Sequence, residues 1–232
     1  MPEPVLYAAP QIQEAHGGVA YKIMGELVPV LEIDMQTSNV YFEHHVLLWK
    51  DTHIDIGLKA LPGMIKRMLA GLPLLITEAS GMGKVAFSRD GAGHVFGIHL
   101  HPGQSIDVRE HQFLAATHTV DYSFKRVKGV GNMLFGGTGI FIDTFSCPRD
   151  TGVLWLHGYG NVFELTLKPG EQIDVEPGGW IFKDASVQME TQFQRFTTGI
   201  FGSAGQIFWN RFTGPGRIGI QSMTYYMPTA DS

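Results

Sequence analysis

The chain has 232 residues, of which 44% are hydrophobic, and its formal net charge is −5. A chain of this length can bury a large core, and its acidic balance gives no electrostatic reason to expect nucleic-acid binding, since phosphate contacts need clustered Lys and Arg. The 29 Gly, 12 Pro and 15 Phe residues favour short strands joined by tight turns over helices, in which Gly and Pro are costly. The composition therefore predicts an all-β protein.

The cysteine content and the N-terminal residues bear on the compartment. A single cysteine, Cys147, excludes an internal disulfide and favours a reducing environment. Residues 1–18 lack the basic and apolar regions of a secretory signal and, with two acidic residues and no Arg, do not resemble a mitochondrial presequence. No stretch approaches the ~20 apolar residues that span a bilayer. We therefore expect a cytoplasmic protein without a transmembrane segment.

The first part of the chain leads into a sequence pattern that is repeated. Residues 1–20 show no sustained periodicity, and we expect an N-terminal arm that packs on the body or on a partner. An entry strand is predicted over 21–30. Apolar residues then alternate with polar ones around Leu31, Ile98 and Leu165, which are evenly spaced (98 − 31 = 67 and 165 − 98 = 67).

The third copy, residues 164–184, is the most regular. Residues 164–168 alternate between polar and apolar, as expected for a strand with one buried face. Residues 168–171 read Lys-Pro-Gly-Glu, in which Pro fixes φ at the second position and Gly takes positive φ at the third, as a type II turn requires. A second strand over 172–175 and a second turn over 176–179 complete the template.

Weaker copies of this template precede it. Glu43, Glu110 and Glu176 keep nearly the same spacing, and each stands before a predicted turn. A strand that follows a glycine closes each copy; these strands are predicted at 83–87, 152–156 and 216–220. A period near 67 residues is longer than that of solenoid units, so we predict three β-sandwich repeats around a pseudo-threefold axis, each covering its neighbour's strand edges. The predicted repeats are 21–91, 92–160 and 161–232, in one compact body.

One segment departs from the all-β pattern. Residues 62–71 read PGMIKRMLAG, with Pro in the first turn, apolar side chains on one side and Gly at the end. The pattern predicts a short amphipathic helix in the first repeat. Its Lys66 and Arg67 would let it contact a membrane surface, but at this length we favour a helix that caps an open end of the core.

These stretches together resemble a known family. The triplicate plan, the segments YKIMGELVPVLEI and LKPGEQIDVEPGGWIFKD, the run LFGGTGIFI and the ending RFTGPGRIGIQS are similar to the altered inheritance of mitochondria protein 24 family, over about residues 20–224. The resemblance implies a fold related to the tryptophan RNA-binding attenuation protein: three β-sandwich repeats in one chain, commonly assembled into oligomers. It carries over no catalytic residues. The absence of a presequence points to a bacterial-type member.

His99 and His101 are the sharpest candidates for chemistry. With Gly93 they match the start of the first cupin motif, in which two imidazoles on alternate strand residues bind a divalent metal. The match ends there, because cupins place a Glu four or five residues later, where this chain has Ser105 and Ile106.

The repeat register gives an independent test of these two histidines. His99 aligns with Glu32 and His101 with Asp34, and the third copy also has polar residues at both positions. These are the polar members of strands whose apolar members face the core. We therefore expect both imidazoles on an outward polar face, and we predict no catalytic residue, no metal ligand and no cofactor.

Three further histidines fall in predicted turns. His44 and His111 stand where the third copy has Pro177, and His45 is adjacent. Without paired Cys or an H-E-x-x-H motif, they are best interpreted as surface imidazoles that respond near pH 6.5. Because function on a repeat scaffold should reside where the copies differ, we expect His44, His45, His111, Lys66 and Arg67 to contribute to a partner surface.

Cys147 and the four tryptophans have ordinary structural interpretations beside their functional ones. The neighbouring Arg149 could lower the pKa of the Cys147 thiol, but no His is identifiable as its base. The tryptophans could line a ligand cleft or an RNA-stacking platform, with core packing as the default interpretation. They are Trp49, Trp155, Trp180 and Trp209.

The sequence thus favours a non-enzymatic interaction or scaffold module that forms a homo-oligomer and presents loops or edges to an unidentified protein partner. The supporting observation is a regular architecture without a convergent polar cluster. Two alternatives stay open: a cupin-like metal-dependent enzyme that uses His99 and His101, and an RNA-binding protein by analogy of fold.

Overall fold

The computed structural model describes residues 5–6, 13–15, 18–59, 76–127, 140–197 and 204–224. These residues form four antiparallel sheets and, within the same ranges, a single 3-10 turn, η1 (His44–Val46). The predicted all-β class is therefore confirmed. The helix predicted over 62–71, with Lys66 and Arg67, lies outside the described residues.

The strands fall into three consecutive sets of six, preceded by β1 (Val5–Leu6), β2 (Gln13–Ala15) and β3 (Val19–Met24). The first set is β4 (Val30–Met35), β5 (Val40–Glu43), β6 (Leu47–Lys50), β7 (Asp55–Leu58), β8 (Ile76–Ser80) and β9 (Gly83–Phe87). The second set is β10 (Gly93–Leu100), β11 (Ser105–Arg109), β12 (Phe113–Thr117), β13 (Asp121–Val127), β14 (Ile140–Ser146) and β15 (Gly152–Tyr159). The third set is β16 (Val162–Leu167), β17 (Gln172–Val175), β18 (Trp180–Asp184), β19 (Gln188–Thr197), β20 (Ala204–Thr213) and β21 (Gly216–Gln221).

The strands pair in the same way within each set. The sixth strand lies between the first and the third, as β9 lies between β4 and β6. The fifth strand lies between the second and the fourth, as β8 lies between β5 and β7. Each set therefore provides two three-stranded pieces, which we call the 1-6-3 half and the 2-5-4 half.

Halves of successive sets join edge to edge. β5 pairs with β12 and β11 pairs with β18, so twice the second strand of one set pairs with the third strand of the next. The joined sheets have the orders β10-β15-β12-β5-β8-β7 and β1-β16-β21-β18-β11-β14-β13. The two remaining halves form a five-stranded sheet, β2-β3-β4-β9-β6, and a three-stranded sheet, β17-β20-β19.

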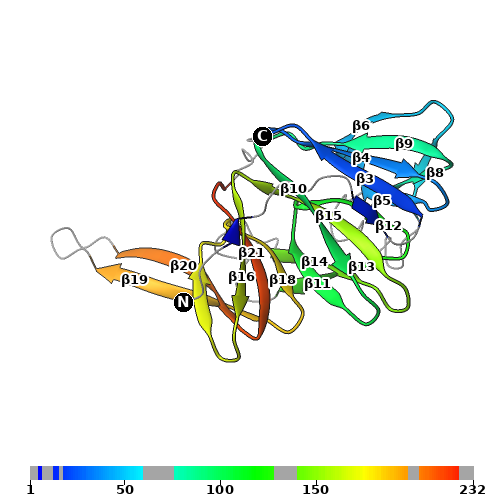
Figure 1. Ribbon diagram of the computed structural model, residues 1–232. Helices are drawn as coiled ribbons and strands as arrows, with labels where there is room; N and C mark the ends of the chain where they lie inside the picture. The colour runs from blue at the N-terminus through cyan, green and yellow to red at the C-terminus, as the bar shows by residue number, and fades with distance from the viewer. Residues whose placement is uncertain are drawn as a thin grey trace.

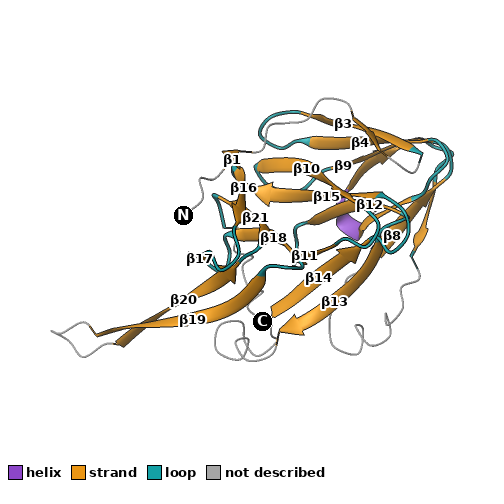
Figure 2. Cartoon of the chain, turned by 60° about the horizontal axis from the view of Figure 1, so that its bottom comes forward, coloured by secondary structure: helices purple, strands orange, loops and turns teal. Residues whose placement is uncertain are grey.

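Three hydrophobic cores lie between the four sheets. The first core joins Ile33 of the five-stranded sheet to Trp155 of the six-stranded sheet. The second core joins Phe96 of the six-stranded sheet to Phe182 of the seven-stranded sheet, and the third packs the seven-stranded sheet on Phe212. The first and third sets lie at opposite ends of the molecule, and the β19–β20 hairpin extends away from the body (Figures 1 and 2).

The template over 164–184 forms as predicted. Glu171 N donates to Lys168 O at 3.0 Å, and Gly170 between them has φ of 76°, the left-handed conformation that this turn requires. The second turn closes in the same way, with Gly179 N donating to Glu176 O at 2.8 Å. The local pattern of the third set therefore reflects turn chemistry.

The strand predicted over 21–30 is wrong as a single element. β3 ends at Met24, the chain turns at Gly25 with φ of 88°, and β4 begins only at Val30. Leu27 in the turn is 77% exposed. Apolar residues in a turn imitate the strand pattern, and a positive φ at Gly25 is what separates the two strands.

The strand pairing also corrects the predicted register of the sets. Each third strand carries a β-bulge at the same place: between Leu47 and Trp49, Phe113 and Ala115, and Trp180 and Phe182. Counted from these bulges, Ile33, not Leu31, corresponds to Ile98 and Leu165. A shift by two residues leaves a period-two pattern unchanged, so hydrophobicity alone did not reveal the error.

The turn register changes as well. Through the same pairings Glu43 corresponds to Arg109 and Glu176, so the predicted equivalence of Glu110 is wrong by one residue. His111 accordingly corresponds to His45, whereas His44 corresponds to Glu110. The connection between the first two strands is one residue shorter in the first set. The predicted register is therefore wrong by two residues in the first strand but by only one in the second.

Candidate functional site

His99 and His101 lie at the end of β10 beside a polar groove of about 480 Å³. Ile98 and Leu100 are buried, His99 is half-buried and His101 is exposed, so the alternation places both imidazoles on the outward face. The nearby carboxylate of Asp184 is engaged by the Arg217 guanidinium at 3.0 Å. In the described ranges, no group of three His, Cys, Asp or Glu side chains could hold a metal ion.

The turn histidines surround a buried ion pair that the sequence did not reveal. Glu43 ends β5 with 3% of its side chain exposed, and Arg89 follows β9 with 2% exposed. The Arg89 guanidinium donates to Glu43 Oε2 and, at 3.4 Å, to Phe113 O of the second set. Burial works against ionisation of Glu43, but His111 and the charge of Arg89 outweigh it and lower the pKa of the carboxyl.

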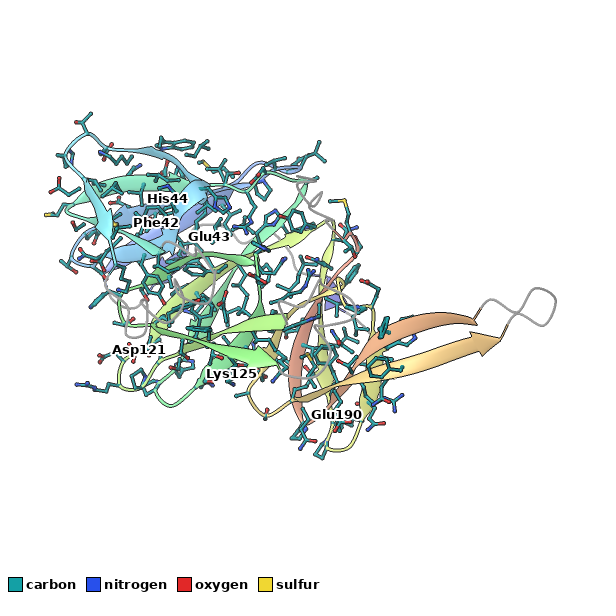
Figure 3. The ribbon with its side chains drawn as sticks, turned by 180° about the vertical axis from the view of Figure 1, so that it is seen from behind. Phe42, Glu43, His44, Asp121, Lys125 and Glu190 are labelled. Carbon is teal, nitrogen blue, oxygen red and sulfur yellow. The ribbon has the colours of Figure 1, made fainter. Side chains whose placement is uncertain are left out.

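His45 and His111 approach this carboxylate from different sets. His45 Nε2 lies 3.5 Å and His111 Nδ1 3.9 Å from Glu43 Oε1, and about half of each imidazole is exposed. His44 turns elsewhere, with Nδ1 3.4 Å from Thr77 Oγ1. Figure 3 shows Glu43 and His44 together at the end of β5. The structure thus brings two of the three predicted turn histidines together.

The predicted candidate Cys147 and a further histidine are both buried. The Cys147 side chain is fully buried, and burial raises the pKa of its thiol, so activation by Arg149 is not observed. His157, which the sequence did not single out, is also fully buried; burial and then the charge of Arg89 lower its pKa to about 4. An imidazole with so low a pKa is a weak base, and a thiol that stays protonated is a weak nucleophile.

The tryptophans divide between core and surface. Trp155 and Trp180 are buried, as core packing predicts, and Trp209 is half-buried. Trp49 on β6 is 43% exposed, and the adjacent Leu48 is 53% exposed. Two large apolar side chains therefore lie open on one edge strand.

This exposure is peculiar to the first set. The residues that correspond to Leu48 and Trp49 at the bulge are completely buried in the other two sets; they are Leu114 and Ala115 in β12, and Ile181 and Phe182 in β18. β12 and β18 are covered because each pairs with the second strand of the preceding set. β6 is the edge of its sheet.

β17 forms the complementary edge. It ends the three-stranded sheet, and its core-facing residues Ile173 and Val175 are half-buried. The corresponding residues of the other second strands are completely buried; they are Val40 and Phe42 in β5, and Ile106 and Val108 in β11. The third core is therefore less fully covered than the first two at this edge.

These features define a class: an all-β protein of stacked antiparallel sheets whose best candidate site is a pair of open sheet edges. The chain belongs to the AIM24 family, because the model of that family, described as mitochondrial biogenesis AIM24, matches residues 21–223. The family resemblance seen in the sequence is thereby confirmed.

A solved structure shares the fold. The crystal structure of protein SPYM3_0169 from Streptococcus pyogenes matches with a TM-score of 0.69 and 20% sequence identity, over 89% of this chain and 94% of that chain. Comparison with curated proteins finds no match. Within the part of the chain that the structure describes, no helix is long and apolar enough to cross a membrane.

Proposed function

We propose that the protein is a non-enzymatic interaction or scaffold module that associates with further copies of itself. The observation that carries the proposal is the exposure of Leu48 and Trp49 on β6, at positions that are buried in the other two sets. Soluble proteins usually protect strand edges with charges, bulges or covering segments, because an open apolar edge is a template for pairing.

The proposal treats the three sets as three β-sandwich repeats of one unit. The common pairing scheme and the bulge at one position in every third strand support this view. The repeats follow one another around an axis, in a fold related to the tryptophan RNA-binding attenuation protein that the family resemblance implies. Each joint completes the covering of one core, so in this fold a repeat is stabilised by its neighbour.

A second part of the proposal concerns the protein partner. The predicted partner surface includes the exposed imidazoles of His44, His45 and His111, in the turn where the third set has Pro177 and Gly178, and the sequence prediction adds Lys66 and Arg67. Its support is the convergence of His45 and His111 on Glu43. A partner identified by cross-linking in the source cell should lose binding to the His45→Ala, His111→Ala double variant, which should still self-associate.

Light scattering on purified protein over a range of concentrations tests self-association. The weight-average mass should rise above that of one 25.6 kDa chain as concentration increases. A particle that stays monomeric at tens of micromolar would contradict the proposal. Elemental analysis of the same tag-free sample addresses the cupin alternative, for which a stoichiometric metal that is lost in His101→Ala is required.

A further inference from the structure

We infer that copies of this chain assemble head to tail, with β6 of one copy pairing with β17 of the next. The inference rests on the proposed self-association and specifies its contact. Three features carry it: the two unjoined half-sheets, the side chains that line their edges, and the register of the joints already present within the chain.

The unjoined halves are complementary. The five-stranded sheet contains a 1-6-3 half that ends at β6, and the three-stranded sheet is a 2-5-4 half that ends at β17. Both other joins in the described residues connect these same two kinds of edge. The first and third sets lie at opposite ends of the molecule (Figure 1), so a second copy, and not the same chain, is the partner that each edge can reach.

The joints within the chain share one register, which predicts the register of the third. The opposed residues are Phe42 and Ala115, Tyr41 and Ala116, and Val40 and Thr117 in the first joint. In the second joint they are Val108 and Phe182, Asp107 and Lys183, and Ile106 and Asp184. The corresponding pairs between copies are Val175 with Trp49, Asp174 with Lys50, and Ile173 with Asp51.

The central pair matches in charge. In the second joint Lys183 Nζ lies 2.8 Å from Asp107 Oδ2, and both side chains are buried. Lys50 and Asp174 stand at the corresponding positions of the two open edges. A joint between copies therefore forms the same cross-strand ion pair, at a position where the first joint has Tyr41 and Ala116 instead.

The present contacts of Asp174 are compatible with this pair. Its carboxylate accepts two hydrogen bonds from Arg211 on the neighbouring strand, each of 2.7 Å. Asp107 shows a carboxylate bound from both sides: Thr144, which corresponds to Arg211, donates to Oδ1 at 2.7 Å, Lys125 donates to the same oxygen at 3.0 Å, and Lys183 binds Oδ2. One carboxylate can thus serve both neighbouring strands.

The apolar side chains match as well. Residues of β12 and β18 that correspond to Leu48 and Trp49 lie in the core of the preceding set, the first core for β12 and the second for β18. In a joint between copies, Leu48 and Trp49 would extend the third core, which Ile173 and Val175 leave half-covered. Burial of these four side chains supplies the driving force for association.

The contact has a fixed polarity. It joins two different edges, so each copy retains one free edge after it binds one neighbour. Such a heterologous contact produces a ring when the rotation between copies closes, and a filament otherwise. Each joint creates a continuous sheet from the three-stranded and five-stranded sheets of adjacent copies.

Charge reversal tests the pair. Lys50→Asp and Asp174→Lys should each weaken association by about tenfold or more, because like charges then face each other in the joint. An equimolar mixture of the two variants should regain association, since each Lys50→Asp edge can pair with an Asp174→Lys edge. Arg149→Asp and Asp150→Lys alter exposed charges in the loop between β14 and β15 of the second set and should leave association unchanged.

Cysteine cross-linking tests the register. A Lys50→Cys copy mixed with an Asp174→Cys copy should form a disulfide-linked dimer on oxidation, and native Cys147 is too deeply buried to compete. Leu58→Cys, 65% exposed on β7 of the six-stranded sheet, replaces Lys50→Cys as the control and should give no such dimer.

The outcomes separate this inference from the proposed function. Wild-type protein that associates, but ignores both charge reversals and gives no Lys50→Cys to Asp174→Cys cross-link, would overturn the joint while self-association stands. If neither charge reversal weakens association and the mixture of the two variants does not change it, the joint is likewise overturned while self-association stands. Wild-type protein that stays monomeric would overturn both.

Discussion

At the scale of single residues, the structure shows a large side chain opposite a small one at the same point of every set. Just past the bulge, the third strand faces the sixth strand. The opposed residues are Trp49 and Ala86, Ala115 and Trp155, and Phe182 and Gly219. Since the bulky residue changes strands from one set to another, the volume of the pair is maintained while the sequence similarity at each position is lost.

Gly219→Ala tests this compensation. A Cβ at Gly219 would lie 2.3 Å from the Phe182 ring, so the substitution should destabilise the fold by about 1–3 kcal/mol in urea unfolding. Adding Phe182→Leu should recover part of the loss, because the two sites are coupled. Gly57→Ala, which meets nothing within 4 Å, is the control and should be close to neutral. Equal effects at both glycines would contradict the pairing argument.

His157 makes stability depend on pH. Burial lowers the pKa of this imidazole from 6.5 to about 4, so between these values the unfolded chain binds a proton that the folded chain does not. Its contribution, of about 3 kcal/mol, is complete above pH 6.5 and is lost as the pH falls towards 4. His157→Gln, which introduces the residue that the third set has at Gln221, should flatten the unfolding free energy over this range.

The control for this measurement is His53→Gln, because His53 is exposed. Its unfolding free energy should follow the wild-type curve between pH 4 and pH 7. If His157→Gln retains the full acid sensitivity of the wild type, the buried imidazole is not its source, and Glu43 with Arg89 becomes the next group to test.

At the scale of elements, β11 lies inside its sheet and β17 at a sheet edge, although both are the second strand of their set. They differ in what covers them. The same position carries Asp107 in β11, buried against Lys183, and Asp174 in β17, paired with Arg211 at the surface. A buried charge without its partner is far more costly than an exposed one, because water no longer solvates it. A comparison of substitutions at the two aspartates therefore reports how strongly the joint makes stability depend on this carboxylate.

Alanine substitutions at these two positions should differ strongly. Asp107→Ala leaves the Lys183 ammonium buried without its carboxylate and should lower the free energy of unfolding by about 3–5 kcal/mol. Asp174→Ala, measured on dilute monomer, should have little effect. Denaturant midpoints give the comparison, and a small loss for Asp107→Ala would show that the second joint does not depend on its ion pair.

Local sequence patterns predicted the strands and turns better than they predicted which distant residues pack against them. The turns at Gly170 and Gly179 followed from Pro and Gly placement, because turn geometry is decided by adjacent residues. The pairing of Glu43 with Arg89 spans 46 positions and leaves no local signal. Likewise the apolar run at Leu48 and Trp49 predicted a strand but could not show that the core it fits belongs to a preceding set.

At the scale of the whole molecule, the three sets share a common pairing scheme without closing on themselves. Two joints cover the first and second cores, and the open edge at β17 leaves the third core half-covered at its rim. Among the described strands, apolar side chains are therefore exposed on β6 and only half-covered on β17, at the two ends of the series. In the proposed assembly, a further copy supplies the missing half at each end, so assembly would extend the same principle that holds the sets together.

This view predicts that thermal stability depends on protein concentration. Partners that bind only the folded state raise the unfolding temperature by mass action, so the wild-type midpoint should increase with concentration. Trp49→Ser removes the largest apolar side chain of the β6 edge and should abolish that increase; because Trp49 is only 43% exposed, it should also lower the midpoint of dilute protein. A matched change at Leu58, 65% exposed on β7 of the six-stranded sheet, should retain the wild-type dependence. If Trp49→Ser retains it too, the stabilising contact between copies lies elsewhere, since no assembly through β6 can leave this side chain outside the joint.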